Sequence, residues 1–293
     1  MSIIITGATG QLGSRVIGQL LKQEVPAEHI VALVRHPEKA AHLAELGLEL
    51  RYGDYNDRFS LQSAFAGADK LLFIPSPDAH DETLRLLQHT HVAIAARDAG
   101  VPHIVYYGYA FAEESKLPLA ATHLLTEGIL RSTGIPYTFL RNPLYADVFL
   151  DPQSLQAAAQ YGTLKANTGE GAIHSPSRYD LARAGAAVLT GEGHENKTYE
   201  LVLGRTWTFR ELADAIASVA GKPVGYEPIT SEENQALLVQ AGLPKEVAGM
   251  LSGINDFIAS GGSSRTGKDL EHLIGEPTPL QELVREGLAM KTS

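Results

Sequence analysis

Three glycines near the start of the chain have the spacing of a loop that binds phosphate. Gly7, Gly10 and Gly13 lie in ITGATGQLG, between an isoleucine-rich run and a segment with helical periodicity. In such a strand–turn–helix unit the first glycine permits a tight turn, the second lets the backbone approach a pyrophosphate, and the third lets the helix pack on the strand. The helix N-terminus would add N–H groups and partial positive charge. The pattern predicts a dinucleotide site, and the alternative is a tight turn without a ligand.

The second predicted strand ends in VALVRHPEK, which puts Arg35 where a site for NAD usually has an acidic residue. Arginine can hold a ribose 2′-phosphate by charge-assisted hydrogen bonds, each worth about 1.5–3 kcal/mol. Arg35 therefore favours NADP(H) over NAD(H). The alternative is a solvated surface arginine.

Two polar side chains follow the next two predicted strands. Asp54 in GDYND could accept a hydrogen bond from the adenine amino group, and Ser76 in PSP could contact a ribose. Both would lie at the carboxyl edge of a parallel sheet, where ligands bind in open α/β folds. Helix capping explains the nearby Asp57 equally well, and a rigid turn without a ligand explains PSP.

The helical segment after the fifth predicted strand carries His123 and Glu127, four residues apart and so on one helix face. His123 could bind the nicotinamide ribose or donate a proton, with Glu127 orienting it. An ordinary helical His–Glu contact is the alternative. The Tyr-x-x-x-Lys pattern of ordinary short-chain dehydrogenases occurs at 161–165, but Gly162 breaks a helix there, so we expect a turn that enters a strand.

A parallel sheet is needed to position these residues. Short β-branched runs alternate with helix-length segments at 3–6, 30–34, 48–52, 70–74, 103–107 and 137–141. This alternation predicts an α/β fold, a doubly wound parallel sheet of Rossmann type. From about Pro143 the helices lengthen and strand candidates scatter, as at 198–202 and 224–228, while Thr208 and Glu211 form a capping box for a helix that ends near residue 220.

We therefore expect two parts. Residues 1–142 would form an NAD(P)-binding domain, and residues 143–293 a smaller, mostly helical lobe that binds substrate. Part of the second segment, about 178–202, is expected to return to the sheet.

Composition limits the partners and the compartment. The net charge of −10 argues against nucleic acid, because phosphate contacts need a basic surface. The chain has no cysteine, which excludes disulfides, thiolate catalysis and cysteine-ligated metals and fits a reducing cytoplasm. No run approaches the ~18 apolar residues of a membrane helix, and no metal-binding spacing occurs. We expect a cytoplasmic globular protein without a metal, whose oligomeric state the sequence does not indicate.

Taken together, these stretches resemble the NmrA-like group of atypical short-chain dehydrogenases. Within it they are most similar to bacterial NADPH:quinone oxidoreductases of type two and triphenylmethane reductases. The resemblance covers nearly the whole chain and rests on ITGATGQLG, VALVRHPEKA, GDYND, AGVPHIVYYG, the H-x-x-T-E segment, YTFLRNPLY and LIGEPT-x-L. It implies a Rossmann domain that binds NADPH and a small lobe that closes a substrate cleft.

The resemblance also carries over to individual residues. It implies that the phosphate loop includes, besides the three glycines, Thr9, Gln11 and Leu12. It implies that Asn142 and Tyr145 lie where the chain passes from the sheet to the substrate lobe. It also implies that Thr126 belongs to the same helix segment as His123.

The chain departs from the family pattern at two places. Tyr107 and Gly108 stand where relatives often have Ser or Thr, and Gly128 replaces the Lys that commonly follows the Thr-Glu pair. Both departures argue against an ordinary hydroxyl-and-lysine proton donor.

A site without a strong acid favours some acceptors over others. Carbonyl reduction builds charge on one oxygen, so a positioned acid matters. Hydride addition to a quinone gives a delocalised anion that solvent can protonate, so positioning of the acceptor is the main requirement. The sequence predicts an NADPH-dependent oxidoreductase that reduces a quinone or similar conjugated acceptor. Its substrate candidates are Tyr109, Phe111, Asn142, Tyr145 and Phe149.

Two alternatives stay open. One is an NADP-binding redox sensor without catalysis, a class that NmrA-like proteins include. The other is an NADPH reductase or isomerase of another small metabolite.

Overall fold

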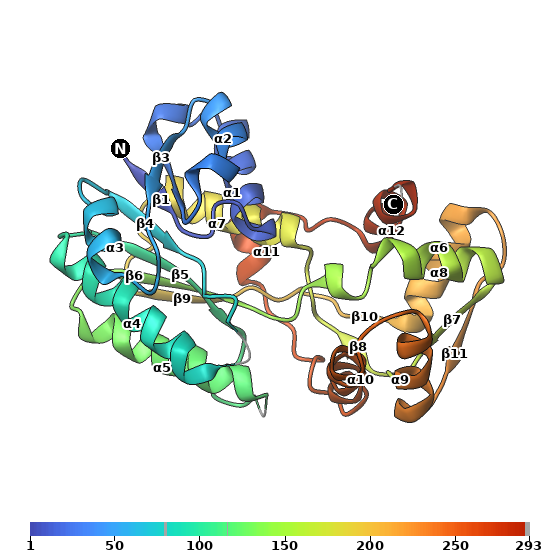
Figure 1. Cartoon of the computed structure of the whole chain (residues 1–293). Helices are drawn as coiled ribbons and strands as arrows, with labels where there is room; N and C mark the ends of the chain where they lie inside the picture. Colours follow the sequence, from blue (N-terminus) through green and yellow to red (C-terminus); the bar gives the residue numbers. More distant parts are fainter. Residues whose placement is uncertain (79–80, 116, 291–293) are drawn as a thin grey trace. The chain divides into compact units, whose positions relative to one another are not determined.

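The computed structural model describes residues 1–78, 81–115 and 117–290 (Figure 1). The chain forms two compact units. The first comprises Met1–Asn142, Arg178–Leu201 and His272–Gly275, and the second comprises Pro143–Ser177, Val202–Glu271 and Glu276–Ser293.

The first unit is built on a seven-stranded parallel sheet with the strand order β3-β2-β1-β4-β5-β6-β9. Its strands are β1 (Ile3–Ile5), β2 (Ile30–Val34), β3 (Glu49–Tyr52), β4 (Lys70–Phe73), β5 (Ile104–Tyr109), β6 (Tyr137–Asn142) and β9 (Lys197–Glu200). Each of the six strands expected in the first half is present with its ends within two residues of the expected ones. The prediction of a Rossmann-type parallel sheet is confirmed.

Helices cover both faces of this sheet. The helices of the unit are α1 (Gln11–Lys22), α2 (Ala41–Glu45), α3 (Arg58–Ala64), α4 (Glu82–Asp98), α5 (Pro118–Ser132) and α7 (Arg178–Thr190), with short 3₁₀ turns η1 (Ala27–His29) and η2 (Pro37–Lys39). Helices α3, α4 and α5 lie on one face, and α1 and α7 pack together on the other (Figure 1). Because the strands are buried on both faces, β1 is a continuous apolar run of three isoleucines.

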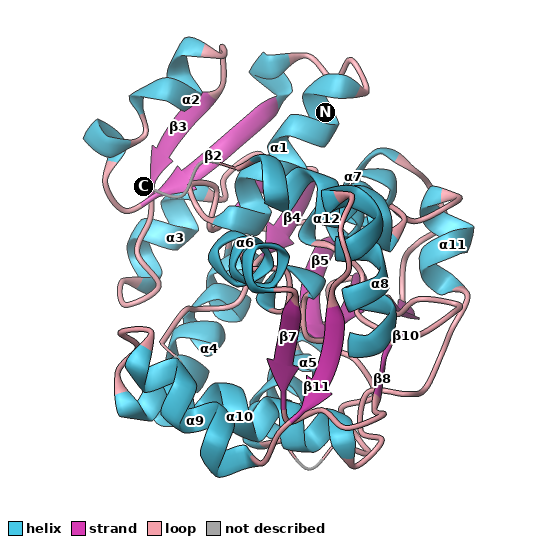
Figure 2. Ribbon diagram, turned by 90° about the vertical axis from the view of Figure 1, so that its right-hand side faces the viewer, coloured by secondary structure: helices cyan, strands magenta, loops and turns pink. Residues whose placement is uncertain are grey.

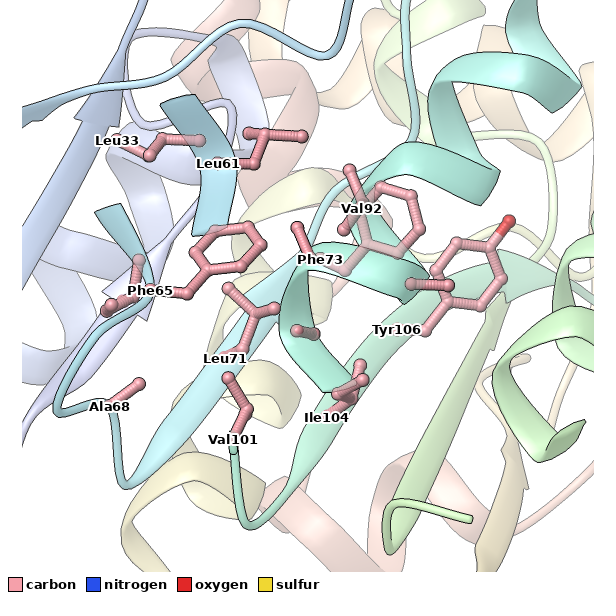
Figure 3. Close-up of a cluster of buried hydrophobic side chains, with 14 of the residues drawn as sticks. Leu33, Leu61, Phe65, Ala68, Leu71, Phe73, Val92, Val101, Ile104 and Tyr106 are labelled. Atoms are coloured by element: carbon pink, nitrogen blue, oxygen red, sulfur yellow. The ribbon is translucent and has the colours of Figure 1, made fainter. Parts of the chain in front are cut away.

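The core between the sheet and the first group of helices is closely filled. Phe65 at the C-cap of α3, Val92 of α4, Phe73 of β4 and Tyr106 of β5 pack into one cluster (Figure 3). On this face Tyr106 also brings a phenol hydroxyl into an apolar region, so that hydroxyl needs a hydrogen-bond partner.

The strand order leaves a crevice at one place. From β1 the chain winds outward through β2 and β3, then returns to place β4 on the other side of β1. The crevice at the carboxyl end of β1 is the usual ligand position in such sheets, and the glycine loop follows this strand directly.

The second unit is smaller and mostly helical. It contains η3 (Ala146–Val148), α6 (Pro152–Tyr161), α8 (Phe209–Ala220), α9 (Ser231–Gln240), α10 (Lys245–Ala259) and α12 (Leu280–Ala289), with α11 (Asp269–Ile274) running from this unit into the first. Two small sheets complete it, β7 (Thr163–Ala166) parallel to β11 (Gly225–Pro228) and β8 (Ala172–Ile173) antiparallel to β10 (Trp207–Thr208) (Figure 2).

Local predictions for this unit are confirmed. Thr208 and Glu211 form the capping box of α8 with both reciprocal hydrogen bonds. Gly162 ends α6 at a φ of +73°, and the chain enters β7, so Tyr161 and Lys165 do not share a helix. The strand expected at 224–228 is present as β11, and the one expected at 198–202 is present as β9, Lys197–Glu200, in the sheet of the first unit. In the part of the chain that the structure describes, no helix is long and apolar enough to cross a membrane.

Candidate functional site

The glycine loop has the geometry that its spacing predicted. Gly7 has a φ of +60°, a left-handed conformation that suits glycine. A Cβ atom on Gly13 would lie 2.3 Å from the carbonyl oxygen of Gly7, so only glycine lets α1 start this close to the loop. The Gly10 N–H donates to the same Gly7 oxygen at 2.9 Å and closes the turn.

The first turn of α1 is open to an anion. Gly10 is the N-cap residue, and no described side chain accepts a hydrogen bond from this helix end. The first N–H groups of a helix lack partners within the helix and carry partial positive charge. A loop that a Cβ would fill and a helix end without a side-chain cap together fit a pyrophosphate.

A cavity of about 280 Å³ lies beside this loop within the first unit. Its wall includes every residue expected to bind the cofactor, namely Gly7, Thr9, Gly10, Gln11, Leu12, Gly13, Arg35, Asp54 and Ser76. They come from the carboxyl ends of β1, β2, β3 and β4, which meet at one edge because the strands are parallel. The structure therefore brings the predicted cofactor residues together, while their binding roles stay predictions.

Further residues of the wall were not expected from the sequence. Gly53 and Tyr55 flank Asp54, and Asp78 and Gln88 lie beyond Ser76. A Cβ on Gly53 would be 2.5 Å from Leu33 Cδ1, so this glycine lets the chain after β3 pass close to β2. Gly53 and Tyr55 could have been found by their place just after β3, and Asp78 by its place in the turn after β4. Gln88 lies within α4, and no local pattern marks it.

The two carboxylates after β3 have different tasks. Asp54 Oδ1 accepts from the backbone N–H and the side-chain amide of Asn56 at 2.9 and 3.1 Å, so Asp54 shapes its own turn while facing the cavity. Asp57 Oδ1 accepts from the N–H groups of Phe59 and Ser60 at 3.0 and 3.3 Å. The helix-capping explanation of Asp57 is confirmed.

Ser76 is held in place by helix α4. Its N–H donates to His89 Nε2 at 3.0 Å, and its hydroxyl contacts Gln88 Oε1 and Asp78 Oδ2. With 3% of its surface exposed, Ser76 is a fixed part of the cavity wall and not a loose turn residue.

His123 and Glu127 both lie on α5 and are buried, at 6% and 0% exposure. The expected contact between them is not made by the described residues. Both oxygens of Glu127 accept from Arg141, at 2.7 and 2.8 Å, and Arg131 adds a further bond at 3.2 Å. Two bonds from a guanidinium are stronger than the single imidazole contact that helical spacing suggested.

Both ring nitrogens of His123 are occupied. Nδ1 lies 2.7 Å from Tyr106 Oη, and Nε2 lies 3.4 Å from Arg85 Nη2. An arginine can only donate, so Nε2 accepts and the imidazole is neutral with its proton on Nδ1. Burial, together with the charge of Arg85, lowers the pKa of His123 to about 3. A neutral imidazole with both nitrogens engaged cannot act as a strong acid near pH 7.

A second buried histidine, His89, extends this network. Its Nε2 accepts from the Ser76 N–H, and its Nδ1 lies 2.8 Å from Thr126 Oγ1, whose hydroxyl donates to the Thr122 carbonyl at 2.7 Å. Burial lowers the pKa of His89 to about 3 as well. Sequence inspection did not find this link between the cavity wall and α5.

The substrate candidates fall in both units. In the first, Tyr109 is buried with its ring centroid 6.2 Å from that of His123, Phe111 is half-buried in the turn after β5, and Asn142 ends β6. Asn142 is 2% exposed, and neither atom of its amide has a hydrogen-bond partner among the described residues. Because a buried amide without partners is costly, Asn142 is the candidate most in need of a ligand.

The remaining two candidates belong to the second unit. Tyr145 is half-buried and precedes η3. Phe149 packs edge-on against Trp207 and Phe209, with ring centroids 6.0 and 6.2 Å apart. Phe149 therefore supports the core of its own unit, and its contact with a substrate stays a prediction.

Comparison with known proteins agrees with this geometry. The model of the NmrA-like family matches residues 1–284. Quinone oxidoreductase 2 of Escherichia coli is 42% identical over 276 residues, which is 94% of each chain. Its crystal structure in complex with NADPH has a TM-score of 0.88 at 41% identity and covers 97% of this chain and 99% of that one. The triphenylmethane reductase of Citrobacter sp. complexed with NADP(H) has a TM-score of 0.94 at 53% identity, covering 98% and 100%.

Proposed function

This chain belongs to the NmrA-like family, and from that premise we propose that it is an NADPH-dependent oxidoreductase that reduces a quinone or a similar conjugated acceptor. The observation that carries the proposal is the cavity beside the glycine loop, whose wall unites all the residues expected to bind the cofactor. Support comes from the quinone and dye reductases to which the chain is 42% and 53% identical.

The residues of the cavity fit NADPH. The N–H groups at the start of α1 would bind the pyrophosphate, and Gly7 and Gly13 keep the space for it clear. Arg35 is exposed at the cavity wall and would pair with the 2′-phosphate. Asp54 would accept from the adenine amino group, and Ser76 would contact a ribose. Bound NADPH supplies a hydride from its nicotinamide ring.

The acceptor is inferred from how the site handles protons. His123 is neutral and has both nitrogens engaged. Burial raises the pKa of Tyr109 to about 12, so its hydroxyl can donate a hydrogen bond but is a weak acid. Such a site suits an acceptor whose reduced form is a delocalised anion that water protonates, as with a quinone. Within the first unit, Tyr109 and Phe111 would pack against its ring, and Asn142 would bind its oxygen.

The same observations keep an NADP-binding redox sensor as the second candidate. The engaged ring nitrogens of His123 fit a protein that binds the cofactor and performs no chemistry. The reductase proposal also includes two further expectations, a cytoplasmic location, which fits the absence of cysteine, and a small-molecule partner.

Turnover of NADPH tests the proposal. We expect the purified protein to oxidise NADPH when benzoquinones, naphthoquinones or cationic dyes are added, at a rate above the uncatalysed one. A Gly13→Ala protein is the control, since turnover must fall with cofactor binding. Tight NADPH binding without oxidation of any acceptor would refute catalysis and favour the sensor.

A further inference from the structure

A buried arginine ties three carboxylates together beside the turn that follows β5. Arg141 of β6 donates from Nε and Nη2 to Glu127 at 2.7 and 2.8 Å, from Nη2 and Nη1 to Glu113 at 2.6 and 2.9 Å, and from Nη1 to Glu200 at 2.9 Å. These bonds use all five N–H donors of a guanidinium. The carboxylates come from α5, from the turn at 110–114 and from β9, so Arg141 joins three separate segments.

The cluster is mostly buried. Arg141 is 5% exposed and Glu127 0% exposed, whereas Glu113 lies at the surface. The Arg141 guanidinium lowers the pKa of Glu113, while burial raises that of Glu200. A Cβ on Gly108 would be 3.2 Å from Glu127 Oε1, so this glycine leaves room for the Glu127–Arg141 pair. The absence of a Ser or Thr at position 108 thus has a packing reason.

The cluster holds a strained residue. Phe111 has a φ of +49°, which is uncommon for any residue except glycine and unfavourable for a bulky side chain. Its N–H donates to Glu200 Oε2 at 2.9 Å, and its carbonyl accepts from Glu114 and Ser115 at 3.0 and 3.1 Å. Two residues further on, Glu113 is bound to Arg141 through both oxygens. The turn is therefore held at Phe111 by Glu200 and at Glu113 by Arg141, and the Arg141 guanidinium binds both of these carboxylates.

Strain of this kind persists where the surrounding structure imposes it, and it gathers at ligand sites. Glycine would adopt the same backbone without penalty, so the phenyl ring is what distinguishes position 111. The turn follows the carboxyl end of β5, the edge of the sheet at which ligands bind.

We propose that Arg141 and Glu200 are positioning residues for the reduction: they hold the 110–114 turn so that the Phe111 ring packs against the acceptor. This inference rests on the proposed function, in which Phe111 is an acceptor contact. Arg141 and Glu200 act through Phe111 and touch neither acceptor nor cofactor.

A double-mutant cycle tests this. Glu200→Ala, Phe111→Ala and the double variant are compared with the wild type for kcat, for the KM of a benzoquinone and for the KM of NADPH. We expect Glu200→Ala to raise the quinone KM by about tenfold, an effect of the size expected for losing one charged hydrogen bond, and to leave the NADPH KM within about twofold. In the Phe111→Ala background the same substitution should change the quinone KM by less than about twofold, because coupled residues are not additive.

The matched control is Glu49→Ala. Glu49 also pairs with an arginine through both oxygens, Arg51 at 2.7 and 3.1 Å, in the same sheet but at β3. The quinone KM of the Glu49→Ala variant should equal that of the wild type. A quinone KM raised equally in both backgrounds, or raised as much by Glu49→Ala, would overturn the positioning role.

If Glu200→Ala does not fold, Glu113→Gln replaces it, because Glu113 lies at the surface and its loss leaves the buried pair intact. The proposal is supported if Glu113→Gln raises the quinone KM and this increase disappears in the Phe111→Ala background. It is overturned if Glu113→Gln leaves the quinone KM at the wild-type value. Wild-type protein that oxidises no NADPH with any quinone defeats the proposed function itself, whereas failure of the cycle in active protein defeats only the positioning role.

Discussion

Gly13→Ala is the sharpest test of the cofactor site, and Gly18→Ala on the same helix is its matched control. A Cβ at Gly13 would lie 2.3 Å from the Gly7 oxygen and 2.9 Å from the Gly7 carbonyl carbon, whereas a Cβ at Gly18 meets nothing within 4 Å. Both changes replace a helical glycine by alanine, which by itself favours the helix by about 0.5–1 kcal/mol. The difference between the two variants therefore isolates the overlap with Gly7.

The size of the effect follows from that overlap. To reach ordinary contact, α1 and the Gly7 carbonyl must move apart by about 1 Å, and such overpacking typically costs about 1–3 kcal/mol. The same shift lengthens a hydrogen bond from an α1 N–H to a phosphate beyond its useful range. Losing one charge-assisted bond of about 1.5–3 kcal/mol weakens binding by about 10- to 100-fold.

Calorimetric titration with NADPH and thermal melts would measure both terms. We expect Gly13→Ala to raise the Kd for NADPH by about 10- to 100-fold and to lower Tm by several degrees relative to Gly18→Ala. Gly18→Ala should bind NADPH like the wild type and melt at the same temperature or slightly higher. Wild-type affinity in Gly13→Ala would refute the assignment of this loop to the cofactor.

Four further predictions concern single side chains and the pH dependence of stability. Arg35→Asp should reduce the preference for NADPH over NADH by at least about tenfold, since it removes a charged bond to the 2′-phosphate, and an unchanged ratio of kcat/KM values would exclude that contact. His123→Ala should lower kcat modestly and keep NADPH affinity, so complete inactivation would identify a proton donor. Because burial lowers the pKa of His123 and His89 to about 3, against about 6.5 in the unfolded chain, the unfolded state binds more protons below pH 6.5 and Tm should fall as pH drops from 6.5 toward 3. The fall should be shallower in His123→Asn, and equal slopes would contradict the shift. Asp57→Ala should lower stability by about 1 kcal/mol in thermal melts without changing the Kd for NADPH, because Asp57 caps α3 outside the cavity wall.

The cofactor half of the site could be predicted because its residues obey local rules. The glycine loop is contiguous, and Arg35, Asp54 and Ser76 each follow a strand of one parallel sheet. In such a sheet the carboxyl ends of the strands meet at one edge, so identifying the strands is enough to bring these side chains together. No long-range packing detail is needed for that step.

The contacts of His123 and Glu127 could not be predicted in the same way. Helical spacing suggested that Glu127 would pair with His123, but its partner Arg141 lies 14 residues away and Glu200 lies 59 residues beyond that. A single surface-type contact along a helix is worth about 0.2–0.5 kcal/mol, much less than bidentate bonds between charged groups in a buried site. The partner is therefore decided by which strand lies beside α5.

The sequence by itself determined the parallel sheet, the phosphate loop and the family, because each depends on short patterns of residue type. Only the tertiary structure decided which partners the buried polar groups take, and with them the protonation state of His123 and the strained turn at Phe111. The physical reason is that a buried charge must find its partners wherever packing places them, and those partners are far apart in the sequence.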